Sequence, residues 1–174
     1  SMKTFNNLYF YKNSIDRSTV IPLDEYFYPL DKIQNWNRIY GKNGFLQYQF
    51  VVPKENGLKP IKMILKKIIE SNETPFLTVL KSMGEKNNNY LSFPIRGYTL
   101  SIDFKISTNL FKLLDCLDEI VIDFGGRIYL AKDSRMSEIT FKKSYQDWET
   151  FDKVRVKYGA KKYISSTQSI RLGL

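Results

Sequence analysis

The sequence predicts an α+β fold in which an antiparallel sheet carries two helices on one face. The segments 47–52 and 97–104 alternate between apolar and polar side chains, as half-buried strands do. The segments 61–68 and 108–124 repeat apolar residues at helical spacing. With two weaker strand patterns, the order of elements is βαββαβ, which predicts a ferredoxin-like arrangement with an N-terminal arm and a helical C-terminal tail.

The chain before the sheet has no clear period. Residues 3–28 are aromatic and irregular, so we expect an extended arm or a connecting strand there. After Pro29, a short helix is expected because Ile33, Trp36 and Tyr40 recur at near-helical spacing.

The sheet and its helices follow in order. The first strand, 47–52, precedes the helix 61–68, and Pro60 suits the first turn of that helix. The second strand is expected at 76–83 and the third at 97–104.

The second helix and the tail complete the chain. Ser107-Thr108 can cap the helix, and Gly125-Gly126 can end it. A fourth strand is expected at 127–130. Beyond it, Ser137 can cap a short helix, 148–158 indicates another, and the end is polar and irregular.

Composition narrows the class of protein. The chain has 174 residues, 43% of them hydrophobic, which suffices for one core with appendages. No segment is long and apolar enough to span a membrane, so the sequence is typical of a soluble protein. The opening Ser1-Met2 is typical of a tag-cleavage scar, and we expect the chain to be a piece of a longer protein. The net charge of +9 would suit an anionic partner. However, the cations are scattered and fit a Lys- and Asn-rich genome bias, so nucleic acid is the weaker interpretation.

The available side chains also exclude several chemistries. Histidine is absent, which rules out Ser-His-Asp catalysis and the usual histidine-based zinc sites in this chain. The single cysteine, Cys116, rules out internal disulfides, and its place in an apolar helix predicts a small core residue. There is no glycine-rich phosphate loop or metal-ligand cluster. Patterns alone therefore indicate an α+β binding domain.

One face of the predicted sheet is polar. Side chains alternate along a strand, so the even positions of 48–52 and 100–104 should lie beneath the helices. The opposite rows hold Gln47, Gln49, Lys81, Thr99, Ser101 and Asp103. This polar row is either the solvated side of the sheet or a pocket wall. In a pocket its amides and hydroxyls would bind sugar hydroxyls, Lys81 would bind an anion or polarise an oxygen, and Val79 and Met83 would form an apolar part.

Lys132 lies just after the fourth strand. It is either part of a surface turn in which Asp133 and Arg135 pair locally, or a cation placed near developing negative charge.

Nearly the whole chain is covered by a set of sequence blocks that can be compared with known families. The blocks are Phe27-Tyr28-Pro29-Leu30-Asp31, Trp36-Asn37-Arg38, Gly44-Phe45-Leu46-Gln47-Tyr48-Gln49-Phe50, Phe76-Leu77, Leu91-Ser92-Phe93-Pro94, Gly97-Tyr98, Gly125-Gly126-Arg127, Ala131-Lys132-Asp133-Ser134-Arg135 and Arg171-Leu172-Gly173-Leu174. Together these blocks resemble one flavoenzyme family, the decaprenylphosphoryl-ribose oxidases, which are FAD-linked oxidoreductases of the vanillyl-alcohol-oxidase type.

The resemblance implies a domain arrangement and a set of site residues. Residues 1–126 would be part of a substrate-binding (cap) domain, and 127–174 would return to an FAD-binding domain that precedes residue 1. Lys132 would be catalytic, beside the flavin N1/C2 carbonyl edge and stabilising the charge of the reduced flavin, with Tyr129 lining the same cavity. The implied substrate-binding residues are Gln47, Gln49, Lys81, Thr99, Ser101, Phe27, Leu30, Val79 and Met83. Among these, Thr99 and Ser101 stand where relatives can carry Asn and Cys, and Met83 where an aromatic residue can occur.

The implied reaction is hydride transfer from a sugar carbinol carbon to FAD, the oxidase step of a 2′-epimerisation of a polyprenyl-phosphate-linked pentose in cell-wall polysaccharide biosynthesis. A nicotinamide-dependent reductase would be the partner. We expect a cytoplasmic protein, with at most a peripheral contact with the inner membrane, and a fragment that is inactive alone.

Two alternatives remain beside this reading. One is a stand-alone, non-enzymatic binding module for a phosphorylated sugar or glycolipid. The other is a basic RNA-binding domain, which the polar Gln47, Gln49 and Lys81 disfavour because they stand where stacking rings are expected.

Overall fold

The computed structural model describes residues 2–14, 18, 20–28 and 31–174, and the chain forms two compact units, Ser1–Lys42 and Asn43–Leu174. The described part of the first unit forms α1 (Met2–Asn13), α2 (Leu23–Phe27) and the 3-10 helix η1 (Trp36–Tyr40).

The expectation of an irregular or extended N-terminal arm is wrong for the two helical stretches. Residues 2–13 contain no Gly or Pro, so nothing interrupts a helical backbone. The apolar residues Leu8–Tyr11 are consecutive, and helical spacing is therefore not visible in the sequence. The short helix expected near residue 36 is confirmed as η1.

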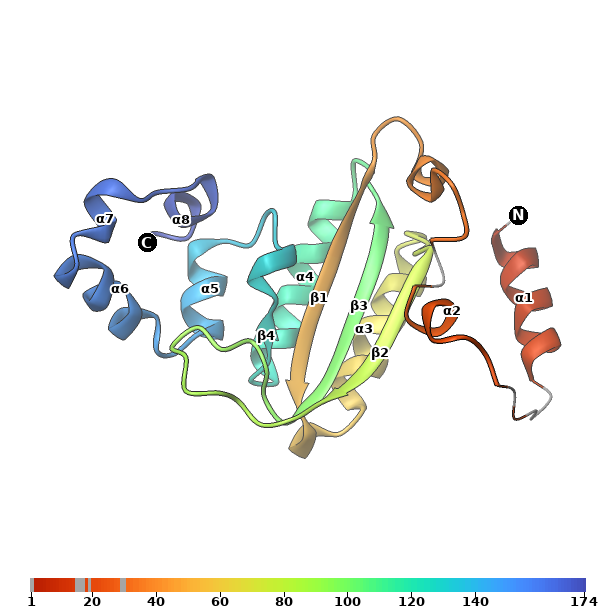
Figure 1. Ribbon diagram of the computed structural model, residues 1–174, viewed down its shortest axis with the longest axis horizontal. Helices are drawn as coiled ribbons and strands as arrows, with labels where there is room; N and C mark the ends of the chain where they lie inside the picture. The colour runs from red at the N-terminus through yellow and green to blue at the C-terminus, as the bar shows by residue number, and fades with distance from the viewer. Residues whose placement is uncertain (1, 15–17, 19, 29–30) are drawn as a thin grey trace. The chain divides into compact units, whose positions relative to one another are not determined.

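The second unit is built on the predicted sheet. Its strands are β1 (Phe45–Pro53), β2 (Leu77–Met83), β3 (Gly97–Lys105) and β4 (Arg127–Ile128). They pair in the order β2-β3-β1-β4, and all three pairings are antiparallel. Figure 1 shows β1 and β3 side by side at the centre. This confirms the ferredoxin-like α+β prediction.

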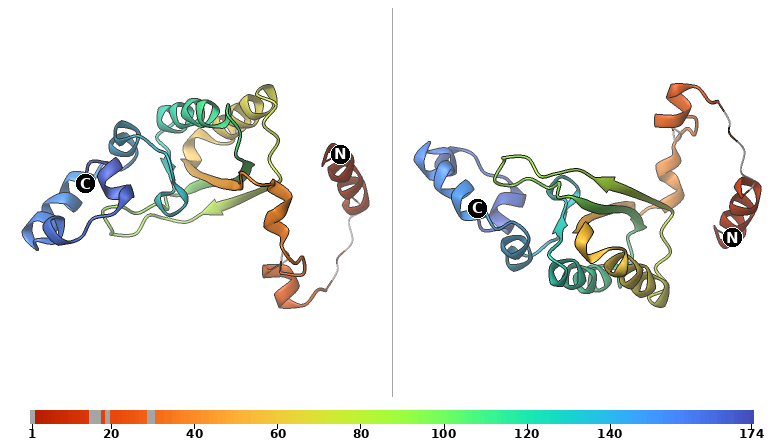
Figure 2. Two further views of the ribbon diagram at one scale, coloured as in Figure 1. Left: turned by 90° about the horizontal axis from the view of Figure 1, so that it is seen from above. Right: turned by 90° about the horizontal axis from the view of Figure 1, so that it is seen from below.

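Two helices cover one face of this sheet. α3 (Lys59–Glu70) and α4 (Leu110–Asp123) lie on the same side of the strands, as the views in Figure 2 show. The predicted local signals are present: Pro60 is in the first turn of α3, and the Ser107 hydroxyl accepts a hydrogen bond from the Leu110 N–H at 3.2 Å.

The hydrophobic core lies between sheet and helices. The even-numbered strand rows are buried there, for example Phe50 and Ile102 at 0% exposure. The prediction that Cys116 is a small core residue is wrong, because this side chain is exposed. It lies outside the stripe that α4 turns toward the sheet, which runs through Leu113 and Leu117.

The opposite face of the sheet is covered at one end by the loop between β2 and β3. In this loop the Phe93 ring packs on the Tyr129 ring with centroids 4.4 Å apart, and the Ser92 carbonyl accepts a hydrogen bond from Arg127. Val51, which points to this face, is consequently fully buried. The remainder of this face is where the polar row lies.

The chain turns sharply after β4, so the fourth strand is shorter than the predicted 127–130. The Tyr129 N–H still bonds to the Gln49 carbonyl at 2.8 Å, but the 3-10 helix η3 (Leu130–Lys132) then begins. The remaining elements are η2 (Lys54–Asn56), α5 (Glu138–Ser144), α6 (Trp148–Lys157), α7 (Ala160–Tyr163) and α8 (Thr167–Arg171).

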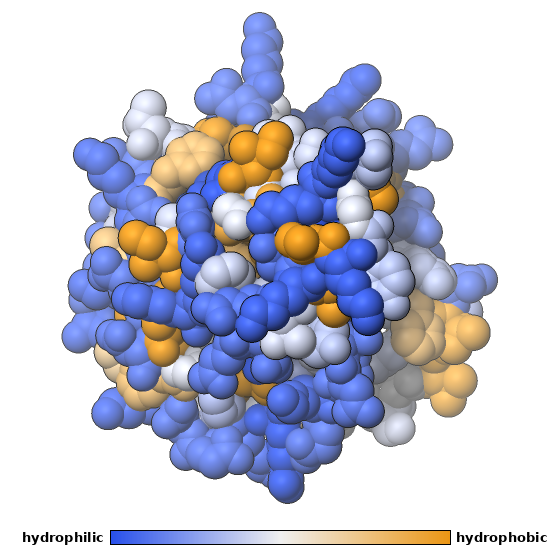
Figure 3. Space-filling model, turned by 90° about the vertical axis from the view of Figure 1, so that its left-hand side faces the viewer, coloured by the Kyte–Doolittle hydropathy of each residue, from blue (hydrophilic) through white to orange (hydrophobic). Residues whose placement is uncertain are grey.

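The tail is more helical than expected. Ser137 caps α5 as predicted, accepting the Thr140 N–H at 3.1 Å, and the helix expected at 148–158 is α6. The expected irregular end instead forms α7 and α8, of which α8 begins with a capping box between Ser166 and Ser169. Figure 3 views the end of the unit that carries these helices, where apolar residues form separate islands in a mainly hydrophilic surface.

Candidate functional site

The polar row lies on three adjacent strands, β2, β3 and β1, whose register brings its members face to face. Gln47 pairs with Asp103 and Gln49 with Ser101 across β1 and β3, and Lys81 of β2 pairs with Thr99. Because every one of these positions points away from α3 and α4, their side chains share one face of the sheet.

The two glutamine amides are fixed by hydrogen bonds across the sheet. Gln47 donates to the Asp103 carboxylate at 2.9 Å, and Gln49 donates to the Thr99 hydroxyl at 3.0 Å. Thr99 in turn donates to the Phe50 carbonyl at 2.7 Å. Thr99 and Asp103 are only 1% and 2% exposed, so this part of the row is an ordered layer that water does not freely solvate.

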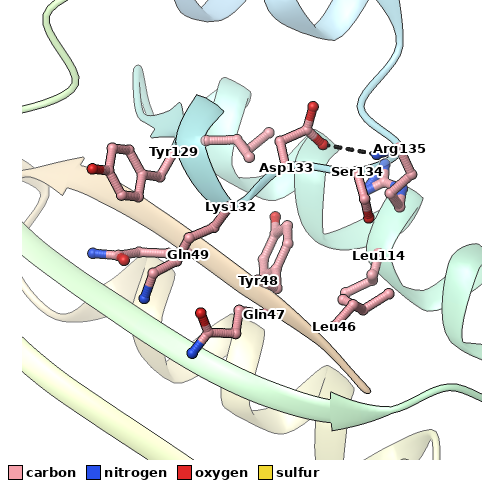
Figure 4. Close-up of a pocket in the computed structure, with 11 residues that line it drawn as sticks. Leu46, Gln47, Tyr48, Gln49, Leu114, Tyr129, Lys132, Asp133, Ser134 and Arg135 are labelled. Carbon is pink, nitrogen blue, oxygen red and sulfur yellow. Dashed lines mark hydrogen bonds between the residues drawn. The ribbon is translucent and has the colours of Figure 1, made fainter. Parts of the chain in front are cut away.

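Lys132 reaches into this layer from η3. Its amine donates to the Ser101 hydroxyl on β3 at 3.1 Å, so the side chain extends across β1 from one side of the face (Figure 4). Burial lowers the pKa of Lys132, while the nearby Asp103 carboxylate raises it and Lys81 lowers it. The local surface-turn interpretation is therefore wrong for Lys132.

The recess beside Lys132 is small. It is bounded by β1, α4 and the residues after β4, and Gln47, Gln49, Tyr129 and Lys132 are among its lining residues (Figure 4). Its volume of about 10 Å³ is close to that of one water position. A ligand larger than water would therefore have to lie over the polar row, with the recess holding at most a single atom or water.

The structure places some of the other predicted site residues on the polar face of the sheet. Val79 and Met83 of β2 pair with Ser101 and Gly97, which puts them on the same face at the edge of the sheet. Phe27 belongs to the first compact unit, in α2. Leu30 lies outside the described residues.

A buried charged cluster, which the sequence patterns did not reveal, lies behind the recess. Asp118 of α4 accepts a hydrogen bond from the Tyr48 hydroxyl at 2.9 Å and pairs with Arg135, which also pairs with Asp115 at 2.8 Å. Burial raises the pKa of Asp118 to about 6, although Arg135 and Tyr48 both lower it. Burial also raises the pKa of Tyr48 well above its usual value, and Asp118 adds to this. In the sequence, the one sign of this cluster is a carboxylate, Asp118, within the apolar stripe of α4.

The residues after Lys132 are held by a second pair. Asp133 pairs with Arg171 of α8 at 2.8 Å, and its carboxylate also accepts the backbone N–H groups of Arg135 and Met136. The local ion pair between Asp133 and Arg135, one of the two alternatives, is thus replaced by a backbone contact, because each charge has its partner on a different helix.

Comparison with known proteins finds relatives of this chain. The chain is 41% identical over 148 residues to decaprenylphosphoryl-beta-D-ribose oxidase of Mycolicibacterium smegmatis, covering 85% of this chain and 32% of that protein. It is also 37% identical over 97 residues to a Streptomyces coelicolor protein described only as "uncharacterized protein in mprA 5′ region", covering 55% of this chain and 26% of that protein. No protein-family model matches. The similarity predicted from the sequence blocks is confirmed, and the chain spans about a third or less of the length of these relatives.

Proposed function

We propose, taking the similarity to decaprenylphosphoryl-beta-D-ribose oxidase as the premise, that this chain is the substrate-binding part of an FAD-dependent oxidoreductase that oxidises a sugar hydroxyl. In this proposal the activity belongs to the full-length protein, and this chain is inactive alone.

The observation that carries the proposal is the position of Lys132. A lysine donating to Ser101 within an ordered layer of amides and hydroxyls combines a positive charge with fixed hydrogen-bonding groups. Such a set suits a reaction in which a polyol is held in one orientation while negative charge develops close by.

The residues of this chain that fit a flavin would contact one edge of its ring system. FAD, when bound, supplies the acceptor for the hydride that leaves the sugar carbon. Lys132 and Tyr129 are the residues of this chain that would contact it, because both line the recess. The half-buried ammonium of Lys132 would stabilise negative charge more strongly than an exposed lysine, since fewer water molecules screen it.

The substrate in this proposal is a polyprenyl-phosphate-linked pentose. Gln47, Gln49, Thr99 and Ser101 would bind its hydroxyl groups. The exposed Lys81 would bind its phosphate. The apolar part of the wall is assigned to Val79 and Met83.

The proposed domain division places 1–126 in the substrate-binding domain and 127–174 against an FAD-binding domain. Support comes from the tail helices, where several apolar side chains are exposed to an extent that is unusual for residues of their size. They are Val156 (60%), Tyr158 (74%), Tyr163 (78%), Ile164 (69%) and Ile170 (71%). A covering domain would bury them.

The keto sugar that the reaction yields would be reduced by a nicotinamide-dependent reductase, which we propose as the functional partner. Among the described residues, no helix combines the length and apolar character needed to cross a bilayer. We propose a cytoplasmic protein whose contact with the inner membrane is peripheral, through its lipid-linked substrate.

The test is substrate-driven reduction of the bound flavin in the full-length protein, followed by absorbance in a stopped-flow instrument. We expect Lys132→Ala to abolish reduction, whereas Lys105→Ala, which removes an exposed lysine from the end of β3, should leave it intact. Near-normal reduction in Lys132→Ala would remove this residue from its assigned role. Absence of reduction in the unmodified protein would refute the oxidase proposal.

A further inference from the structure

The short turn that carries Lys132 is held in place by the last helix of the chain. α8 contacts this turn through two side chains one helical turn apart. Gln168 donates to the Leu130 carbonyl at 2.7 Å, and Arg171 bonds to both the Asp133 carboxylate and the Met136 carbonyl. The contacts lie on both sides of Lys132 in the sequence.

The contact between Arg171 and Asp133 is sheltered from water. The Asp133 side chain is 3% exposed and that of Arg171 is 25% exposed, and their closest atoms are 2.8 Å apart. One oxygen of the carboxylate serves Arg171, and the other accepts the N–H groups of Arg135 and Met136 at 3.0 and 2.7 Å. Removal of the guanidinium would leave a buried carboxylate without its cation, which is costly and favours rearrangement of the turn.

A rearrangement of this turn would move Lys132 directly. Asp133 is its neighbour in the chain, and the Lys132 N–H closes the turn by bonding to the Tyr129 carbonyl at 3.1 Å. The bond from the Lys132 amine to Ser101 spans from η3 to β3, so a small rotation of η3 is enough to break it.

We propose that Arg171 is a positioning residue, which acts through Asp133 to hold the Lys132 amine against the polar row. The guanidinium does not touch Lys132; it fixes the backbone from which Lys132 extends. The catalytic consequence rests on the proposed oxidase function, whereas the structural consequence does not.

The first experiment measures the position of Lys132 without any enzymatic assay. The full-length protein is treated with a trace amount of an amine-acylating reagent, and the labelling rate of Lys132 relative to the exposed Lys105 is read by mass spectrometry of peptides. We expect Arg171→Met to raise this ratio at least about fivefold, because the half-buried, hydrogen-bonded amine becomes accessible. Arg171→Lys keeps the charge but lacks the planar fork, so we expect a smaller increase.

The matched control is Arg155→Met. Arg155 of α6 also pairs with an aspartate, Asp152, at 3.3 Å and bonds to the Ile164 carbonyl, and both partners lie within the tail. We expect its variant to leave the labelling ratio of Lys132 unchanged. An equal ratio in Arg171→Met and the unmodified protein would overturn the proposal, as would an equal rise in Arg155→Met.

A milder variant keeps the test decisive if Arg171→Met does not fold. Asp133→Asn retains the oxygen that accepts the two backbone N–H groups while weakening the pair with Arg171. If Arg171 acts through Asp133, Asp133→Asn alone raises the labelling ratio, and adding Arg171→Lys raises it little further. Independent, multiplicative effects of the two substitutions would overturn the proposal.

The catalytic consequence is measured separately. We expect Arg171→Lys to lower kcat for substrate oxidation roughly 10- to 100-fold with little change in KM, because the polar row remains intact while the Lys132 amine is displaced. If the unmodified protein reduces no flavin, the oxidase proposal fails, yet the labelling ratios still decide whether Arg171 positions Lys132.

Discussion

Replacement of Tyr48 by Phe isolates one buried hydrogen bond to a carboxylate. Tyr48 is 4% exposed and Asp118 is 2% exposed, and the distance between the hydroxyl and the carboxylate oxygen is 2.9 Å. A hydrogen bond to a charged acceptor contributes about 1.5–3 kcal/mol, whereas one to a neutral acceptor contributes about 0.5–1.5 kcal/mol. The cost of Tyr48→Phe should therefore depend on whether Asp118 is ionised.

The pKa of Asp118 gives this dependence its direction. Burial raises the pKa from 3.8 to about 6, so the folded protein binds a proton that the unfolded chain has released over this interval. The contribution of this group to stability is fully present below about pH 3.8 and falls by about 3 kcal/mol as the pH rises through 6. The Tyr48 hydroxyl bonds to the ionised form and offsets part of that loss, so its removal raises the pKa of Asp118 further and costs more at high pH.

We expect the free energy of unfolding to fall by about 1 kcal/mol at pH 5 and by about 2 kcal/mol or more at pH 8 in Tyr48→Phe. Urea titrations followed by tryptophan fluorescence at the two pH values would measure both losses. The contributions of other titrating groups to the free energy of unfolding cancel when the two proteins are compared at the same pH.

Tyr145→Phe is the matched control for this measurement. The Tyr145 hydroxyl is equally buried, but it donates to the Ile128 backbone carbonyl at 2.7 Å, an acceptor that does not ionise. Its loss of about 1 kcal/mol should be the same at both pH values. An equal loss for Tyr48→Phe at pH 5 and pH 8, or an equal pH dependence in the control, would refute the reasoning.

Three further predictions concern the strand pairing, a helix cap and the substrate. A methyl group at Gly97 would lie 2.0 Å from the Val52 carbonyl oxygen, so Gly97→Ala should lower the free energy of unfolding, measured by urea titration, by about 2 kcal/mol or more. Gly84→Ala should leave it nearly unchanged, because no atom lies within 4 Å of the added methyl group. Ser137→Ala removes the N-cap of α5 and should cost about 1 kcal/mol in the same assay, and an unchanged midpoint would contradict the cap. If the proposed function holds, Lys81→Met should raise KM roughly tenfold in steady-state kinetics and leave kcat nearly unchanged, because one contact with the phosphate is lost. A large fall in kcat with KM unchanged would contradict that role.

The sheet could be predicted because its signal is local and repetitive. Each of β1 and β3 places an apolar side chain beneath the helices at every second position, and burial of that row leaves alternation in the sequence. The same parity selected Gln47, Gln49 and Ser101 for the polar row, and the structure brings these three together. The N-terminal helix α1 left no such trace, because its apolar residues Leu8–Tyr11 are exposed and need no period.

The environment of Lys132 could not be predicted in this way, because it depends on charges that are distant in the sequence. Arg135 pairs with Asp118, 17 positions away, and Arg171 pairs with Asp133, 38 positions away. Hydrophobic periodicity records which side chains avoid water and carries no information about which cation meets which anion. Asp118 in the apolar stripe of α4 is a local inconsistency, and its partners explain it: Tyr48 of β1 and Arg135 from the turn.

This local inconsistency has a functional meaning if the turn is a catalytic support. Buried ion pairs are weak contributors to net stability, since the desolvation of both charges offsets their attraction. Two such pairs nevertheless meet within the three residues that follow Lys132, whereas the side chains that β1 and β3 turn toward the helices are mostly apolar. Directional pairs fix an orientation that apolar contacts would leave adjustable, and a lysine that must meet one atom of a cofactor needs such an orientation. The cluster is therefore better explained by the placement of the Lys132 amine than by the stability of the fold, and the labelling of Lys132 in the Arg171 variants separates these two explanations.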